Sequence, residues 1–177
     1  KAEGVGWKFA PLRVFPERCE ISLDNDCILW ELPGSMEAWL AGVAKEPQRC
    51  LMAQDVRRCF GQFSEQCGPQ ALNSGIRGVP PGYDLEAALR RVLDRPHGER
   101  VVLTSELDEQ GMQAAALSRG SAPAVARLEE VTICSPFWPL QPQLGRCGAH
   151  FVGLNGRHIP WDYFDRPADA WMAEHWE

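Results

Sequence analysis

Cys67 stands in the segment QFSEQCGPQALN, residues 62–73, where a loop that contains Gly68-Pro69 leads into a predicted helix. At the N-terminus of a helix the unpaired backbone N–H groups and the positive end of the dipole favour a thiolate over a thiol. The same N–H groups can bind a developing oxyanion. This position predicts that Cys67 is the nucleophile of an acyl-transfer reaction that passes through a thioester.

Gln62 lies five residues before this cysteine and can supply a side-chain N–H to an oxyanion hole. Loss of one such donor typically lowers the rate by about 10²–10³-fold. Gln66 is the alternative donor, but a residue adjacent to the nucleophile usually points to the opposite side of the turn. Gln62 is therefore the preferred candidate.

A thiol nucleophile also needs a base, and the base needs a partner that fixes its tautomer. His150 opens a predicted strand, and Asp165 ends the strand that returns after the Asn155-Gly156 turn, a strong hairpin signal. The hairpin can bring the two side chains together. Asp162 competes with Asp165, but strand alternation places it on the other face.

The spacing of these residues resembles the Josephin family of papain-like cysteine proteases. In that family a Gln precedes the catalytic Cys and a Leu-Asn pair follows on the same helix, as Gln62, Cys67 and Leu72-Asn73 do here. A catalytic His then begins a strand, and a Trp leads to the orienting Asn or Asp, the places taken by His150 and by Trp161 with Asp165. The resemblance covers roughly residues 60–95 and 130–177.

The resemblance implies a papain-like fold, in which a helical lobe carrying the nucleophile packs on an antiparallel sheet carrying the His and the Asp. It also implies a deubiquitinase that cleaves isopeptide or peptide bonds at the C-terminus of ubiquitin or a ubiquitin-like protein, which would be its partner. Gly68-Pro69 departs from the family and is more typical of bacteriocin-processing peptidases. A papain-like deamidase or processing peptidase, and a non-catalytic subunit that retains the fold, remain alternatives.

Local patterns predict the elements that would position these residues. Asp84 caps a predicted helix over DLEAALRRVLDR, and Ser35 caps a shorter one before it. A further helix is predicted from Glu109 to Leu117. The predicted strands are residues 100–104, 131–134, 151–154 and 161–164, the last three in one antiparallel sheet. A helix block followed by a sheet block predicts an α+β fold.

The length of 177 residues allows one good hydrophobic core. The first 54 residues differ in character from the rest, so we expect an N-terminal extension of unknown role over 1–54 and a papain-like catalytic domain over 55–177.

A net charge of −6 argues against nucleic-acid and membrane partners, because both require clustered Lys and Arg. The sequence contains neither a long apolar run nor a secretory signal pattern, so we expect a cytoplasmic or nuclear protein. Seven cysteines cannot all pair within one chain, and none forms a CxxC motif. No metal or other cofactor is expected.

Overall fold

The computed structural model describes Lys8, residues 13–94, 101–134 and 144–152, and the backbone of residues 162–163 and 166–167. The elements follow one another as β1 (Glu20–Leu23), β2 (Cys27–Leu29), α1 (Gly34–Gly42), β3 (Leu51–Gln54), the 3-10 helix η3 (Gly61–Phe63), β4 (Leu72–Val79), α2 (Leu85–Leu93), α3 (Glu106–Leu117), β5 (Ala124–Ala126), β6 (Val131–Cys134), β7 (Gly148–Phe151), β8 (Asp162–Tyr163) and β9 (Arg166–Pro167).

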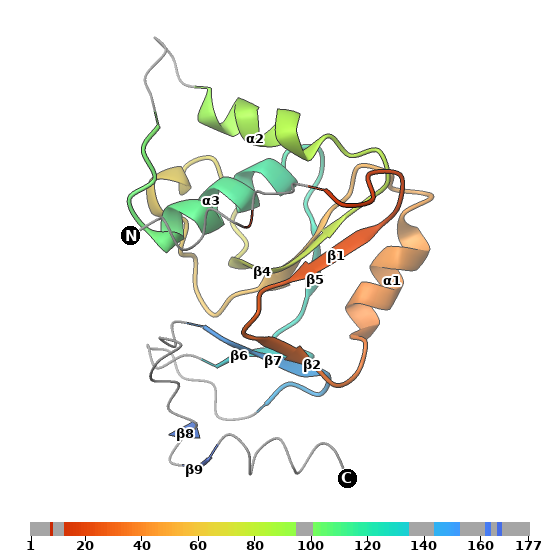
Figure 1. Ribbon diagram of the computed structural model, residues 1–177, viewed down its shortest axis with the longest axis vertical. Coiled ribbons are helices and arrows are strands. Elements are labelled where there is room, and N and C mark those ends of the chain that lie inside the picture. Colours follow the sequence, from red (N-terminus) through yellow and green to blue (C-terminus); the bar gives the residue numbers. More distant parts are fainter. Residues whose placement is uncertain are drawn as a thin grey trace.

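A four-stranded sheet in the order β1-β4-β3-β5 forms the centre of the molecule (Figure 1). The pairs β1–β4 and β4–β3 are antiparallel, and β3–β5 is parallel. Between Met52 and Ala53 the register shifts, so that Met52 faces Arg77 and Ala53 faces Asn73. Residues 74–76 of β4 are therefore released from pairing with β3.

Helices cover both faces of this sheet (Figure 1). Successive side chains of β3 point to opposite faces, so Met52 packs with α2 and α3 in one buried cluster, while Leu51 and Ala53 pack with Met36 and Trp39 of α1 in another. Burial on both faces holds β3 and its partner β4 in the centre of the sheet.

A second sheet, in the order β2-β7-β6, carries His150. β2 and β7 are antiparallel, and Cys27 is the direct register partner of His150. β6 and β7 are parallel, which corrects the prediction that strands 131–134 and 151–154 belong to one antiparallel sheet. A parallel pair requires the chain to cross to the opposite end of the sheet between its two strands, which a tight hairpin cannot do.

The three helices predicted around residues 36–43, 84–95 and 109–117 are confirmed. Asp84 accepts a hydrogen bond from the Ala87 N–H at 2.8 Å and caps α2, as predicted. α3 includes the predicted residues 109–117 and begins three residues earlier, at Glu106. α1 also forms, but Ser35 does not cap it. Instead, the Glu130 carboxylate accepts from the backbone N–H of Ser35 at 3.0 Å.

The helix predicted to begin at Cys67 is absent, and this prediction was wrong. Cys67 lies in a turn, and Leu72-Asn73 begins strand β4 instead. Gly75 and Gly78 fall within this segment, and each glycine costs a helix about 1 kcal/mol relative to Ala. β1 and β3 pair with the two edges of the segment, so its burial favours the strand.

The segment 101–104 is extended but is not a strand, contrary to the prediction. Its Thr104 binds the Asp108 carboxylate at the start of α3 through its N–H and its hydroxyl, at 2.7 and 2.9 Å. The segment is therefore held by a helix terminus, not by a sheet. The predicted hairpin around Asn155-Gly156 lies outside the described residues.

The architecture confirms the α+β class. Strands from residues 20–54 pair with β4 and with β7, so this part of the chain contributes to both main sheets. Over the described ranges, every helix is too short or too polar to cross a lipid bilayer. No disulfide links the seven cysteines, all of which fall within those ranges.

Candidate thiol, imidazole and carboxylate site

Of the site residues predicted from the sequence, His150 is the one that the structure places in a buried position beside a carboxylate. It lies in the middle of its sheet and is 2% exposed. Its Nε2 lies 3.1 Å from Oδ1 of Asp26, in the turn between β1 and β2. A buried imidazole beside a carboxylate is a common arrangement for a base whose orientation is fixed.

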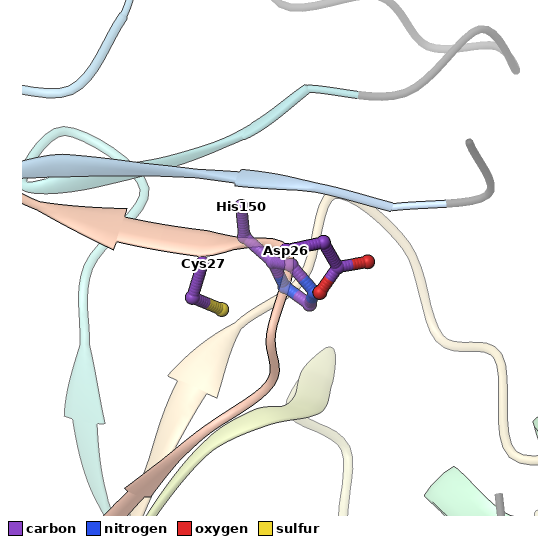
Figure 2. A group of neighbouring side chains, drawn as sticks. All are labelled: Asp26, Cys27 and His150. Atoms are coloured by element: carbon purple, nitrogen blue, oxygen red, sulfur yellow. The ribbon is translucent and has the colours of Figure 1, made fainter. Parts of the chain in front are cut away.

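The Asp26 carboxylate and the Cys27 thiol approach this imidazole from the same turn and strand (Figure 2). One donor atom from each of the three side chains lies within 4.8 Å of the other two. Nδ1 of His150 is buried and makes no hydrogen bond within the described part of the chain, whereas Oδ1 of Asp26 has the Nε2 contact as its partner. Buried polar atoms in this state are uncommon and call for a partner.

The shape of this cluster argues against Cys27 as the nucleophile. In a thiol–imidazole–carboxylate relay the sulfur and the carboxylate lie on opposite sides of the ring, about 7–8 Å apart, the sum of two hydrogen-bonding contacts and the ring width. Here the two atoms lie within 4.8 Å of each other. The three groups form a compact triangle and not a relay.

The carboxylates of Asp26 and Asp24 place negative charge beside the Cys27 thiol. Burial alone raises the pKa of Asp26, but the adjacent imidazole of His150 outweighs it and holds this pKa below its usual value. Burial and the carboxylates of Asp26 and Asp24 raise the pKa of Cys27 far above its usual range. The Cys27 thiol is therefore protonated at neutral pH.

Gly75 of β4 provides the space for the His150 ring. A Cβ at this position would overlap Cε1 of the imidazole. The Gly75 carbonyl accepts from the Asp24 N–H at 2.7 Å and from the Cys27 thiol at 3.4 Å. The backbone of β4 is thereby fixed against the turn that carries the cluster.

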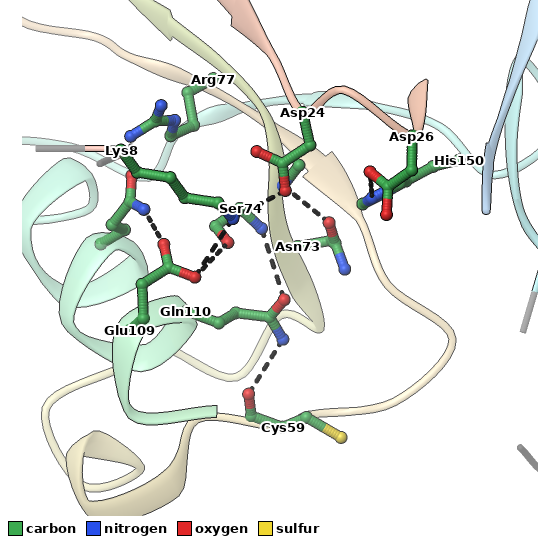
Figure 3. Close-up of polar contacts among 12 residues, drawn as sticks. Lys8, Asp24, Asp26, Cys59, Asn73, Ser74, Arg77, Glu109, Gln110 and His150 are labelled. Carbon is green, nitrogen blue, oxygen red and sulfur yellow. Dashed lines mark hydrogen bonds and ion pairs between the residues drawn. The ribbon is translucent and has the colours of Figure 1, made fainter. Parts of the chain in front are cut away.

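A polar network anchors this turn to α3 (Figure 3). Lys8 bridges Asp24 and Glu109 at 2.7 and 3.2 Å, and Ser74 donates to the same Glu109 carboxylate at 3.3 Å. These charged side chains are nearly buried, so the ion pairs and hydrogen bonds between them must offset the cost of removing each charge from water. The network joins the cluster to the helical side of the molecule.

Cys67 lies in a different environment from His150. Its thiol donates to the Gly111 carbonyl of α3 at 3.3 Å. Burial raises the pKa of Cys67 to about 11, and the nearby Arg58 offsets only part of this effect. The partners of Cys67 and those of His150 have no residue in common, so the structure does not bring the two together. The role of Cys67 as nucleophile stays a prediction.

Gln62 lies in η3, held between Asp108 and residue 102. Its backbone N–H donates to Oδ1 of Asp108 at 2.9 Å, and its side-chain amide donates to the Val102 carbonyl at 2.9 Å. The structure thus places Gln62 on the Cys67 side of the molecule, and its oxyanion role remains a prediction.

Asp108 fixes this region and makes its stability depend on pH. Burial alone raises its pKa, but hydrogen bonds from Gln62 and Thr104 outweigh it and lower the pKa to about 2. A depressed folded-state pKa stabilises the fold above the unfolded value of about 4, and the stabilisation is lost as the pH falls toward 2. We expect Asp108→Asn to lower the free energy of unfolding at pH 7 by about 2 kcal/mol.

Urea denaturation from pH 7 down to pH 2 measures this effect, and the difference between wild type and Asp108→Asn should shrink below pH 4. Glu86→Gln is the matched control, because Glu86 only forms an exposed pair with Arg90 in α2. A constant difference at every pH would contradict the assignment.

Asp165 and the side chain of Asp162 lie outside the described residues, so the predicted orienting role of Asp165 is untested. Sequence reasoning missed Asp26 and Cys27. The signal that could have found them is local: a carboxylate and a thiol are adjacent at the point where the turn D24-N25-D26 enters an apolar strand.

Comparisons of the chain with models of protein families, with curated proteins and with solved structures gave no match. The function is therefore argued from the residues and their geometry.

Proposed function

We propose that the protein is a thiol-dependent hydrolase that cleaves amide bonds through a thioester on Cys67, with His150 as base. The observation that carries the proposal is the setting of His150. This residue was selected as the base from sequence spacing alone, and it is a buried imidazole with a carboxylate 3.1 Å from Nε2. A buried imidazole held by a carboxylate is the arrangement that orients a general base.

In the proposed reaction the Cys67 sulfur attacks the scissile carbonyl as His150 removes the thiol proton. The imidazolium then gives this proton to the leaving amine, which leaves an acyl thioester on the sulfur. Water, deprotonated by His150, hydrolyses the thioester and restores the thiol. Asp26 or Asp165 orients the imidazole and stabilises its charged form.

The proposal requires the Cys67 thiol to leave the Gly111 carbonyl and reach the imidazole, because the two lie in separate environments here. The structure is then a resting form in which the thiol is protonated. Catalytic contacts are often incomplete before substrate binds. A cleft of about 570 Å³ lined by Gln66 and Gly68, on either side of Cys67, gives a substrate access to this loop.

The substrate class follows from the resemblance to Josephin enzymes and is ubiquitin or a ubiquitin-like protein. A fluorogenic amide at the C-terminus of ubiquitin tests it directly. We expect turnover by the wild type and covalent capture of Cys67 by a ubiquitin C-terminal electrophile, located by mass spectrometry of the digested adduct.

The alternatives give distinct results in the same experiment. Iodoacetamide labelling of Cys67 at neutral pH without turnover of the ubiquitin amide would favour a deamidase or a processing peptidase of another substrate class. A Cys67 thiol that is inert to both reagents would favour a non-catalytic protein and would overturn the proposal.

A further inference from the structure

We infer that Asp26, Cys27 and His150 form a binding site for a divalent transition metal of the zinc type. The site is distinct from the proposed nucleophile Cys67. Its donor set is a carboxylate oxygen, a thiol sulfur and an imidazole nitrogen, which come from one turn and two paired strands (Figure 2). Zinc binds all three of these donor types, while magnesium and calcium prefer oxygen ligands.

The distances fit a single ion. Tetrahedral zinc with bonds of about 2.0–2.3 Å holds its ligand atoms about 3.3–3.8 Å apart. The three donor atoms already lie within 4.8 Å of one another, and Nε2 of His150 is 3.1 Å from Oδ1 of Asp26. Small side-chain rotations are enough to close the triangle around a metal.

The second observation is a buried ring nitrogen of His150 that has no hydrogen-bond partner. Nδ1 of His150, on a residue that is 2% exposed, is buried without a hydrogen bond among the described residues. A cation would supply the missing partner for the cluster. The ring is held rigidly between β7 and Gly75 of β4, so it is preorganised to bind.

The charge around the cluster also suits a cation. Asp24 adds a second carboxylate from the same turn, and its negative charge acts on the Cys27 sulfur. Lys8 is the opposing charge, but it is engaged by Asp24 and Glu109. A bound zinc replaces the Cys27 thiol proton, which passes to the buffer, and the resulting thiolate is stabilised by the metal.

Three protein ligands leave a fourth position, which water or an external ligand takes in open zinc sites. The Asp26 side chain is 36% exposed, whereas that of His150 is 3% exposed, so the approach for a metal is from the carboxylate side.

Titration of the reduced full-length chain with Co²⁺ tests the inference without any turnover assay. We expect one equivalent of Co²⁺ to produce a thiolate-to-cobalt charge-transfer absorption in the near ultraviolet, and one equivalent of Zn²⁺ to remove it. Cys27→Ser should abolish this absorption. Asp26→Asn should weaken metal binding by about 10–100-fold.

Cys19→Ser and Cys67→Ser are the matched controls and should keep the absorption, since neither residue belongs to the cluster. Asp26→Asn changes a partly exposed side chain without altering its shape, so it reports on the site even where Cys27→Ser fails to fold. No charge-transfer absorption in the wild type would overturn the inference. So would an unchanged absorption in a folded Cys27→Ser variant, or binding that Asp26→Asn does not weaken.

Discussion

Replacement of Cys67 by Ala should lower kcat/KM for the ubiquitin amide by at least about 10⁴-fold, because the proposed thioester forms on the sulfur that this change removes. His150→Ala should cause a loss of similar size, since the thiol is protonated at rest and needs a base. The measurement is initial rates at saturating and at limiting substrate. Cys19→Ser, which changes a thiol outside both proposed sites, should keep the wild-type rate.

The orienting carboxylate is identified by the same assay. Asp26→Asn and Asp165→Asn each retain nucleophile and base, so the variant that removes the orienting group should leave a measurable residual rate. Full activity in His150→Ala would contradict the mechanism. Loss of covalent capture in Cys27→Ser together with its retention in Cys67→Ala would show that the nucleophile had been assigned to the wrong cysteine.

Elements that depend on local sequence could be predicted. The helix after Asp84 has a capping side chain and an apolar stripe, and the strand 131–134 is β-branched and buried. Both signals are contained within a few residues. The helix 106–117 was predicted from its Ala-rich part, residues 109–117, and its first turn lies before that part.

Elements that depend on distant partners could not be predicted. Leu72-Asn73 was assigned to a helix because the resemblance places a Leu-Asn pair on the helix of the catalytic Cys. The segment forms a strand instead, because β1 and β3 flank it on both sides. Ser35 has the right type for a cap, but Glu130, far along the chain, takes that role. Both contacts join residues that are far apart along the chain, so local sequence patterns do not reveal them.

The candidate site shows the same division. His150 could be selected because its spacing to other residues matches a chemical pattern. The adjacent carboxylate and thiol of Asp26 and Cys27 are visible in the sequence, but their link to His150 is not, because it arises only through the pairing of β2 with β7. The seven cysteines contain no CxxC motif, so no local pattern indicates the metal site that we infer from the topology.

His150 belongs to both proposals, and this has a chemical consequence. An imidazole whose lone pair is held by a metal cannot accept a proton from a thiol. Occupation of the metal site and base catalysis at Cys67 therefore exclude each other. The two proposals remain separable, because metal binding needs Cys27 but not Cys67, and thioester formation needs Cys67 but not Cys27.

Gly75→Ala should weaken both the proposed hydrolysis and the proposed metal binding, because both depend on the His150 side chain. Its Cβ would overlap the His150 ring, and the Gly75 carbonyl is held by Asp24 and Cys27, so the imidazole and not the strand must move. A displacement of about 1 Å at a reacting group costs about 10²-fold in rate. We expect a loss of kcat/KM of this order, a weaker cobalt absorption, and a destabilisation of about 1–3 kcal/mol from overpacking.

Gly42→Ala is the matched control, because a Cβ at the end of α1 meets no atom within 4 Å. It should leave the rate and the cobalt absorption unchanged, and circular dichroism and thermal unfolding establish that both variants are folded. A folded Gly75→Ala variant with wild-type turnover and wild-type metal binding would show that the His150 ring does not occupy this space in the working protein. Loss of turnover alone, or of the cobalt absorption alone, would show that the two proposed roles of His150 need different ring positions. A rotated ring can keep its contact in one role and lose its contact in the other.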